Sequence, residues 1–154
     1  MSNIINVNDF NYQVIINSLK VAGMQAQAWS HEGLILLGFS TKLIKKTIHE
    51  DANAFRLNVM LNAKLIEPKT LSDLYLAINH LNPQVFFGKI YIHSEGALGM
   101  SYEIPLIAGI TQEQILIYTR EFDDAVKNVM AYMEQEGFLD VNDNNDAFVD
   151  ISKM

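Results

Sequence analysis

The chain has 154 residues, of which 49% are hydrophobic, and a formal net charge of −7. This length is that of one ordinary domain, and the hydrophobic content excludes a disordered chain. The absence of cysteine excludes disulfides, thiolate nucleophiles and cysteine-ligated zinc, and the acidic balance argues against a dedicated nucleic-acid binder, because phosphate neutralisation supplies most of that affinity.

The first expected element is a helix from about Asn8 to Ala22, followed by Gly23, which is suited to a left-handed helix end. Asn8 or Asp9 can cap its first turn. The helix has one apolar side, so it is predicted to pack against the rest of the domain.

From residue 25 to 65 the hydrophobic period changes to two, which predicts strands. The strands are expected at residues 26–29, 34–39, 41–49 and 54–63. The third of these also fits a helical spacing, and the turn at residues 50–53 favours a strand. The last alternates cleanly, which requires one buried face and one accessible face.

The unit from Thr70 to Gly137 carries the strongest local signals. Thr70 and Thr111 each begin a capping box, which predicts one helix that stops at Asn82-Pro83 and another that runs to Gly137. Between the helices, residues 85–93 and 98–106 are predicted to form a hairpin. Its second strand ends near a proline, Pro105.

The element order is therefore α-β-β-β-α-β-β-α, with one further short strand near Trp29. Mostly antiparallel strands with helices on one face form a two-layer α+β fold. We assign a single domain to residues 1–137 and an acidic polar tail to residues 138–154. Residues 1–10 do not resemble a signal peptide, and no apolar run approaches the roughly 20 residues of a membrane span, so we expect a cytoplasmic protein without membrane contact.

Each candidate catalytic or metal-binding motif in the sequence lacks a residue that its chemistry requires. Two His-Glu pairs, at residues 31–32 and 49–50, lack the second histidine of a zinc protease motif. In the tail, Ile151 stands where a calcium loop needs a bidentate glutamate. Ser101 lies within a predicted strand and lacks the glycines of a nucleophile elbow. We therefore expect no enzymatic activity, no metal and no cofactor.

One face of the predicted sheet is left accessible. If Phe86, Ile90 and Ile92 point into the core, their odd-numbered neighbours point the other way. With alternate residues of the two partner strands, the candidate binding face consists of Arg56, Asn58, Met60, Phe87, Lys89, Tyr91, Ser101 and Glu103. Tyr, Phe, Met and Arg are enriched at protein interfaces, so we expect this face to bind protein; an ordinary solvated face is the alternative.

Several segments in the second half of the chain carry a family resemblance. They are Ile78-Asn79-His80-Leu81-Asn82, Phe87-Gly88-Lys89-Ile90, Tyr102-Glu103-Ile104-Pro105-Leu106 and the capped helix from Thr111. With this pattern the chain resembles the YbjN-like family of bacterial proteins, whose fold resembles that of type III secretion chaperones. The resemblance implies a non-enzymatic binding, chaperone-like or regulatory role, often as a dimer, and it supplies no catalytic residue.

The sequence thus favours a protein-binding module, chaperone-like or regulatory, that acts as a homodimer and binds no nucleic acid. Two alternatives stay open. One is a sensor that binds a small molecule beneath the sheet, and the other is an immunity-type protein whose acidic surface neutralises a basic toxin.

Overall fold

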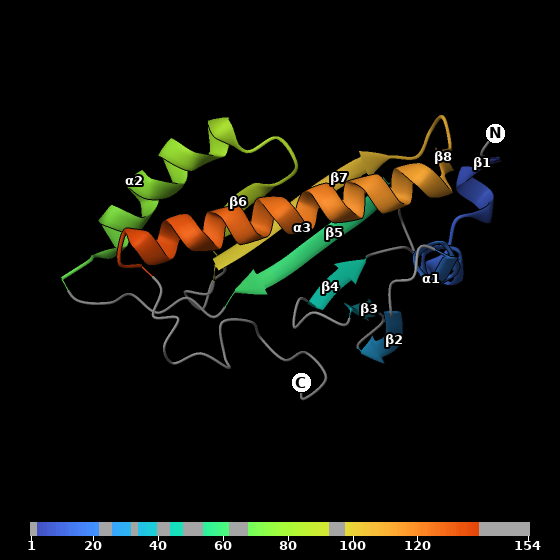
Figure 1. Ribbon diagram of the computed structural model, residues 1–154, viewed down its shortest axis with the longest axis horizontal. Coiled ribbons are helices and arrows are strands. Elements are labelled where there is room, and N and C mark those ends of the chain that lie inside the picture. Colours follow the sequence, from blue (N-terminus) through green and yellow to red (C-terminus); the bar gives the residue numbers. More distant parts are fainter. Residues whose placement is uncertain are drawn as a thin grey trace.

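The computed structural model describes residues 3–21, 26–31, 34–39, 44–47, 54–61, 68–92 and 98–138. Figure 1 shows their arrangement. The helices are α1 (Tyr12–Val21), α2 (Leu71–Leu81) and α3 (Gln112–Gln135), with 3-10 turns at Val7–Asp9 and Asn82–Gln84. The strands are β1 (Ile4–Ile5), β2 (Ala26–His31), β3 (Leu34–Phe39), β4 (Ile44–Thr47), β5 (Ala54–Leu61), β6 (Lys89–Ile92), β7 (Leu98–Pro105) and β8 (Ile110–Thr111).

All the strand pairs in the described residues are antiparallel. They form the groups β1-β8, β2-β3-β4 and β5-β7-β6, and β4 lies against β5. The predicted α+β fold is therefore confirmed, including the short strand near Trp29. In the segment that fitted both a helix and a strand, residues 44–47 are a strand, and residues 41–43, 48 and 49 lie outside the described residues.

The helix α1 begins later than predicted. Residues Val7–Asp9 form a separate 3-10 turn, and the side-chain oxygen of Asn11 accepts a hydrogen bond from the backbone N–H of Val14 at 3.0 Å. Asn11 therefore caps α1 in place of Asn8 or Asp9. Gly23, the predicted end of this helix, lies outside the described residues.

The two predicted capping boxes are both present. The Thr70 hydroxyl accepts from the Asp73 N–H at 3.2 Å, and the Asp73 carboxylate accepts from the Thr70 N–H at 2.8 Å. Thr111 and Gln114 make the same two bonds, at 3.1 and 2.9 Å. These bonds fix the starts of α2 and α3, because they satisfy N–H groups that have no partner within the helix.

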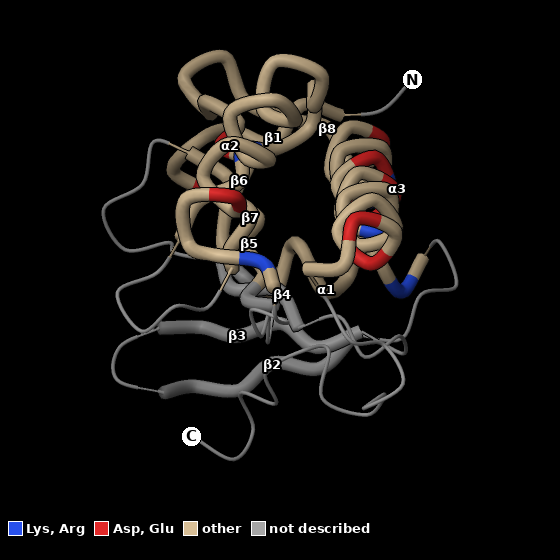
Figure 2. Tube along the Cα trace, turned by 90° about the vertical axis from the view of Figure 1, so that its left-hand side faces the viewer, with Lys and Arg blue, Asp and Glu red and all other residues tan. Residues whose placement is uncertain are grey.

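The core lies between the helices and one face of β5-β7-β6. At 24 residues and 1.5 Å per residue, α3 is about 36 Å long and crosses this face from end to end (Figure 1). Figure 2 views the same layers edge-on, with α3 and the strands on opposite sides of the core. The residues that α3 buries are Ile115, Thr119, Phe122, Val126, Val129 and Met133. Among the described residues, no helix is long and apolar enough to cross a membrane.

The first strand of the hairpin is shorter than predicted. It begins at Lys89, four residues later than Val85, and Phe86, expected in the core, is 85% exposed. The cause is Gly88, whose φ of +148° interrupts the extended backbone. The alternation of inward and outward side chains therefore starts only after Gly88, with Ile90 buried. Residues 93–97, which include the predicted turn, lie outside the described residues, as do residues 139–154 of the predicted tail.

Candidate protein-binding surfaces

The strand register brings most of the predicted binding residues onto one sheet face. Across β5 and β7, Arg56 lies opposite Glu103 and Asn58 opposite Ser101. Across β7 and β6, Ser101 lies opposite Lys89, in the same row as Asn58. These positions alternate with core residues, so their side chains point away from α3. We call this surface, formed by Arg56, Asn58, Lys89, Tyr91, Ser101 and Glu103, the sheet face.

Tyr91 spans the sheet face at one end. It lies opposite Gly99, and a methyl group added to Gly99 would collide with the Tyr91 ring. The ring therefore lies flat over Gly99, and its hydroxyl donates to the side-chain oxygen of Asn58 on β5 at 2.8 Å. The small residue at position 99 is what lets one tyrosine of β6 reach β5 across the strand between them.

The charged residues of the sheet face have local partners. Arg56 and Glu103 form an ion pair, with side chains that are 35% and 53% exposed. The Lys89 ammonium donates to the backbone carbonyls of Asn82 and Val85, at 2.9 and 2.8 Å. Ser101, half-buried, lies between Asn58 and Lys89. The face is thus polar and nearly balanced in charge.

Two of the predicted binding residues are not placed on this face. The side chain of Met60 lies outside the described residues, although its backbone pairs with Gly99 in β5-β7. Phe87 lies on the opposite side of the sheet, so its prediction as a sheet-face residue is wrong. Its ring meets the Tyr102 ring edge-to-face at 5.7 Å, and Tyr102 in turn contacts Tyr118 of α3. The positive φ of Gly88 again explains the reversal.

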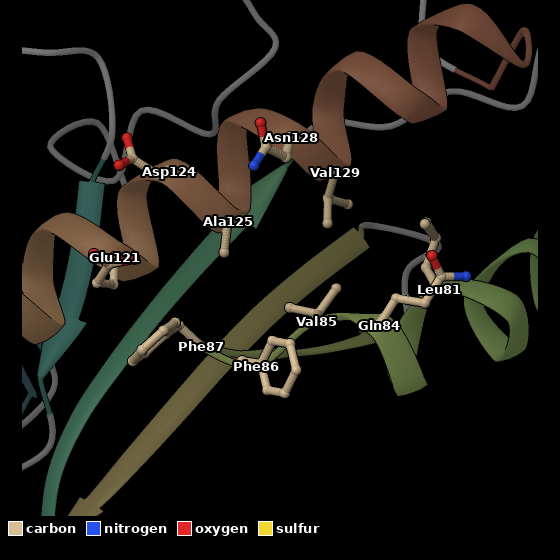
Figure 3. Close-up of a pocket in the computed structure, with 10 residues that line it drawn as sticks. All are labelled: Leu81, Gln84, Val85, Phe86, Phe87, Glu121, Asp124, Ala125, Asn128 and Val129. Atoms are coloured by element: carbon tan, nitrogen blue, oxygen red, sulfur yellow. The ribbon is translucent and has the colours of Figure 1, made fainter.

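A groove that the sequence did not reveal lies beside Phe87. Its volume is about 350 Å³, and it opens between residues 84–87 and α3 (Figure 3). The apolar lining consists of Leu81, Val85, Phe86, Phe87, Ala125 and Val129, and the polar lining of Gln84, Glu121, Asp124 and Asn128. Both charged lining residues are carboxylates. Among the described residues no lysine or arginine lines the groove, so its described lining is apolar with an acidic rim.

Local hydrogen bonds hold the loop wall of the groove. The Asn82 side chain accepts from the Ile90 N–H at 2.7 Å and donates to the Ile90 carbonyl at 3.1 Å. Gln84 donates to the His80 carbonyl at 3.1 Å. Gly88 is buried against Met100 and Phe122, where a Cβ atom would lie 3.2 and 3.3 Å from their side chains. Hydrogen bonds and close packing therefore fix both ends of the segment 82–90, and the loop between them holds Phe86 in solvent.

Burial, with the neighbouring Tyr118 adding to it, raises the pKa of the Tyr102 phenol that lies beside Phe87. Within the described ranges no group of three or more histidine, aspartate or glutamate side chains could hold a metal ion.

The chain matches a known protein family and is similar to solved structures. Residues 8–135 match the YbjN family, described as "Putative bacterial sensory transduction regulator". No curated protein matches the sequence. The chain is similar in structure to "Crystal structure of YbjN, a putative transcription regulator from E. coli", with a TM-score of 0.67 and 14% sequence identity, over 87% of this chain and 96% of that one. At this identity the likeness concerns the fold.

Proposed function

Because this chain belongs to the YbjN family, whose description is that of a regulator, we propose that it is a non-enzymatic regulator that binds protein and works as a homodimer. The observation that carries the proposal is the sheet face. None of the described helices covers it, and it carries Tyr91 and Arg56, two residue types that are enriched at protein interfaces.

Charge supports a second copy as the occupant of the sheet face. The charged residues on the face are Arg56, Lys89 and Glu103, which sum to +1, whereas the whole chain carries −7. Two copies that met through their acidic surfaces would repel each other, and a nearly neutral face avoids that cost. The −7 charge also supports protein over nucleic acid as the partner.

The test inserts a cation at the centre of the sheet face. Ser101→Arg places a long charged side chain between Asn58 and Lys89, where a two-fold interface would set it near its own copy. We expect light scattering after size-exclusion chromatography to report a dimer for the wild type and a monomer for this variant. Ser72→Arg, at an exposed position of α2, is the matched control and should leave the dimer intact. A wild-type monomer, or a dimer that survives Ser101→Arg, would contradict the proposal.

A further inference from the structure

We propose that the groove between residues 84–87 and α3 docks a partner segment in which a lysine or arginine follows an apolar residue. This inference deepens the proposed protein-binding function by naming the chemistry of a partner. It concerns a second surface, because Phe87 and the groove lie on the helix side of β5-β7-β6 and the sheet face lies on the other side.

The first argument is the exposure of the Phe86 side chain. Phe86 is 85% exposed, although it comes directly between two residues that are half-buried, Val85 and Phe87. Its exposure is not that of a loose loop, because the side chains of Asn82, Gln84 and Lys89 form hydrogen bonds with the surrounding backbone. A rigid aromatic held in solvent beside an apolar groove loses little conformational entropy when a partner covers it.

The second argument is the charge of the rim. Glu121 and Asp124 are exposed on α3, and neither makes an ion pair or hydrogen bond with another residue in the described part of the chain. Figure 3 shows both on α3, with Glu121 nearer Phe87 and the Asp124 carboxylate on the side of the helix away from the two rings. The basic residues Arg120 and Lys127 of the same helix do not line it. A cation near this rim gains from the negative charge of both carboxylates.

The third argument decides between a protein segment and a small molecule. Small-molecule sites usually enclose most of the ligand surface. This groove is open to solvent along Phe86, so a small ligand would leave much of that ring in water. A protein segment brings enough surface to cover the ring and to reach the carboxylates together.

The experiment measures the binding of short labelled peptides to the full-length protein by fluorescence anisotropy. The probe alternates leucine and arginine. One comparison peptide replaces arginine with glutamine, and another replaces leucine with serine. We expect the probe to bind most tightly and each comparison peptide to lose about tenfold in affinity, because the site requires both an apolar and a cationic group.

Variants of the protein locate the binding. Phe86→Ser and the double variant Glu121→Gln/Asp124→Asn should each weaken the probe by about tenfold. The matched controls are Ile107→Ser, which removes another apolar side chain that is 89% exposed, and Glu113→Gln/Glu134→Gln, which removes two carboxylates of α3 outside the groove. The controls should change the affinity by less than about twofold.

Three outcomes would overturn the inference. They are no binding of the probe, equal losses in the groove variants and their controls, and a probe that binds no better than its glutamine or serine counterpart. Because the dimer is tested separately through Ser101→Arg, the groove can fail while the dimer stands, and a monomeric protein can still bind the probe.

Discussion

At the scale of single residues, Thr119 places a hydroxyl group in the hydrophobic core. It is fully buried in the core-facing stripe of α3, and within the part of the chain that the structure describes its hydroxyl has no hydrogen-bond partner. A buried hydroxyl without a partner costs more than an apolar group of the same shape. We therefore predict that Thr119→Val raises the free energy of unfolding by about 1 kcal/mol. Urea unfolding followed by circular dichroism measures this change, and a destabilised Thr119→Val protein would show that the hydroxyl has a partner.

A second residue-scale prediction concerns the contact between Gly99 and Tyr91. A methyl group at position 99 would collide with the tyrosine ring, so we expect Gly99→Ala to lower the free energy of unfolding by about 1–3 kcal/mol. The two residues should be coupled. Adding Gly99→Ala to Tyr91→Ala should cost much less than adding it to Tyr91→Phe, because only the phenylalanine retains the ring. Equal costs in these two backgrounds would contradict the overlap.

At the scale of elements, the two capping boxes differ in one feature that can be titrated. The acceptor in α2 is Asp73, whereas in α3 it is the neutral Gln114. Hydrogen bonds from the Thr70 backbone and hydroxyl, with a smaller contribution from Lys69, hold the pKa of Asp73 below its usual value. A carboxyl with a depressed pKa in the folded state stabilises the protein above its unfolded pKa, and this contribution is lost as pH falls through the folded pKa.

We therefore predict that Asp73→Asn lowers the melting temperature at neutral pH and that the difference from wild type shrinks as pH falls below about 4. Gln114→Glu provides the reverse test in α3. It should raise the melting temperature at neutral pH, because a carboxylate in the first turn interacts favourably with the helix dipole. The gain should be lost in acid, where the carboxylate is protonated. Melting curves across the pH range measure both changes. A pH-independent effect of Asp73→Asn would mean that the carboxylate charge contributes nothing.

Comparison of the elements with their predictions shows which parts of the fold the sequence determines locally. Capping boxes are local, so Thr70 and Thr111 predicted the starts of α2 and α3 correctly. The alternation in β5 and β7 likewise predicted which residues share the sheet face. The prediction failed at residues 85–88, because period two was continued through Gly88, whose φ is positive and which packs closely against Met100 and Phe122. That packing joins residues far apart in the chain, and the groove was missed for the same reason.

At the scale of the whole molecule, net charge makes the two proposed interactions respond to salt in opposite directions. Each copy carries −7, so the long-range interaction between two copies is repulsive even when a nearly neutral face forms the contact. Raising the ionic strength shortens the Debye length from about 10 Å at 0.1 M to about 3 Å at 1 M. We therefore predict that the dimer becomes tighter with added salt, as sedimentation equilibrium at several sodium chloride concentrations would measure.

The groove should respond in the opposite sense, because its attraction for a cation comes from the exposed Glu121 and Asp124. We predict that the affinity for the leucine–arginine peptide falls as salt rises, while the apolar contact with Phe86 is unaffected by screening. In the Glu121→Gln/Asp124→Asn variant this salt dependence should be weaker, and in Phe86→Ser it should persist at lower affinity. Dimer and peptide affinities that fall together with salt would mean that both depend on the general acidity of the chain, and the separation into a neutral face and an acidic groove would be wrong.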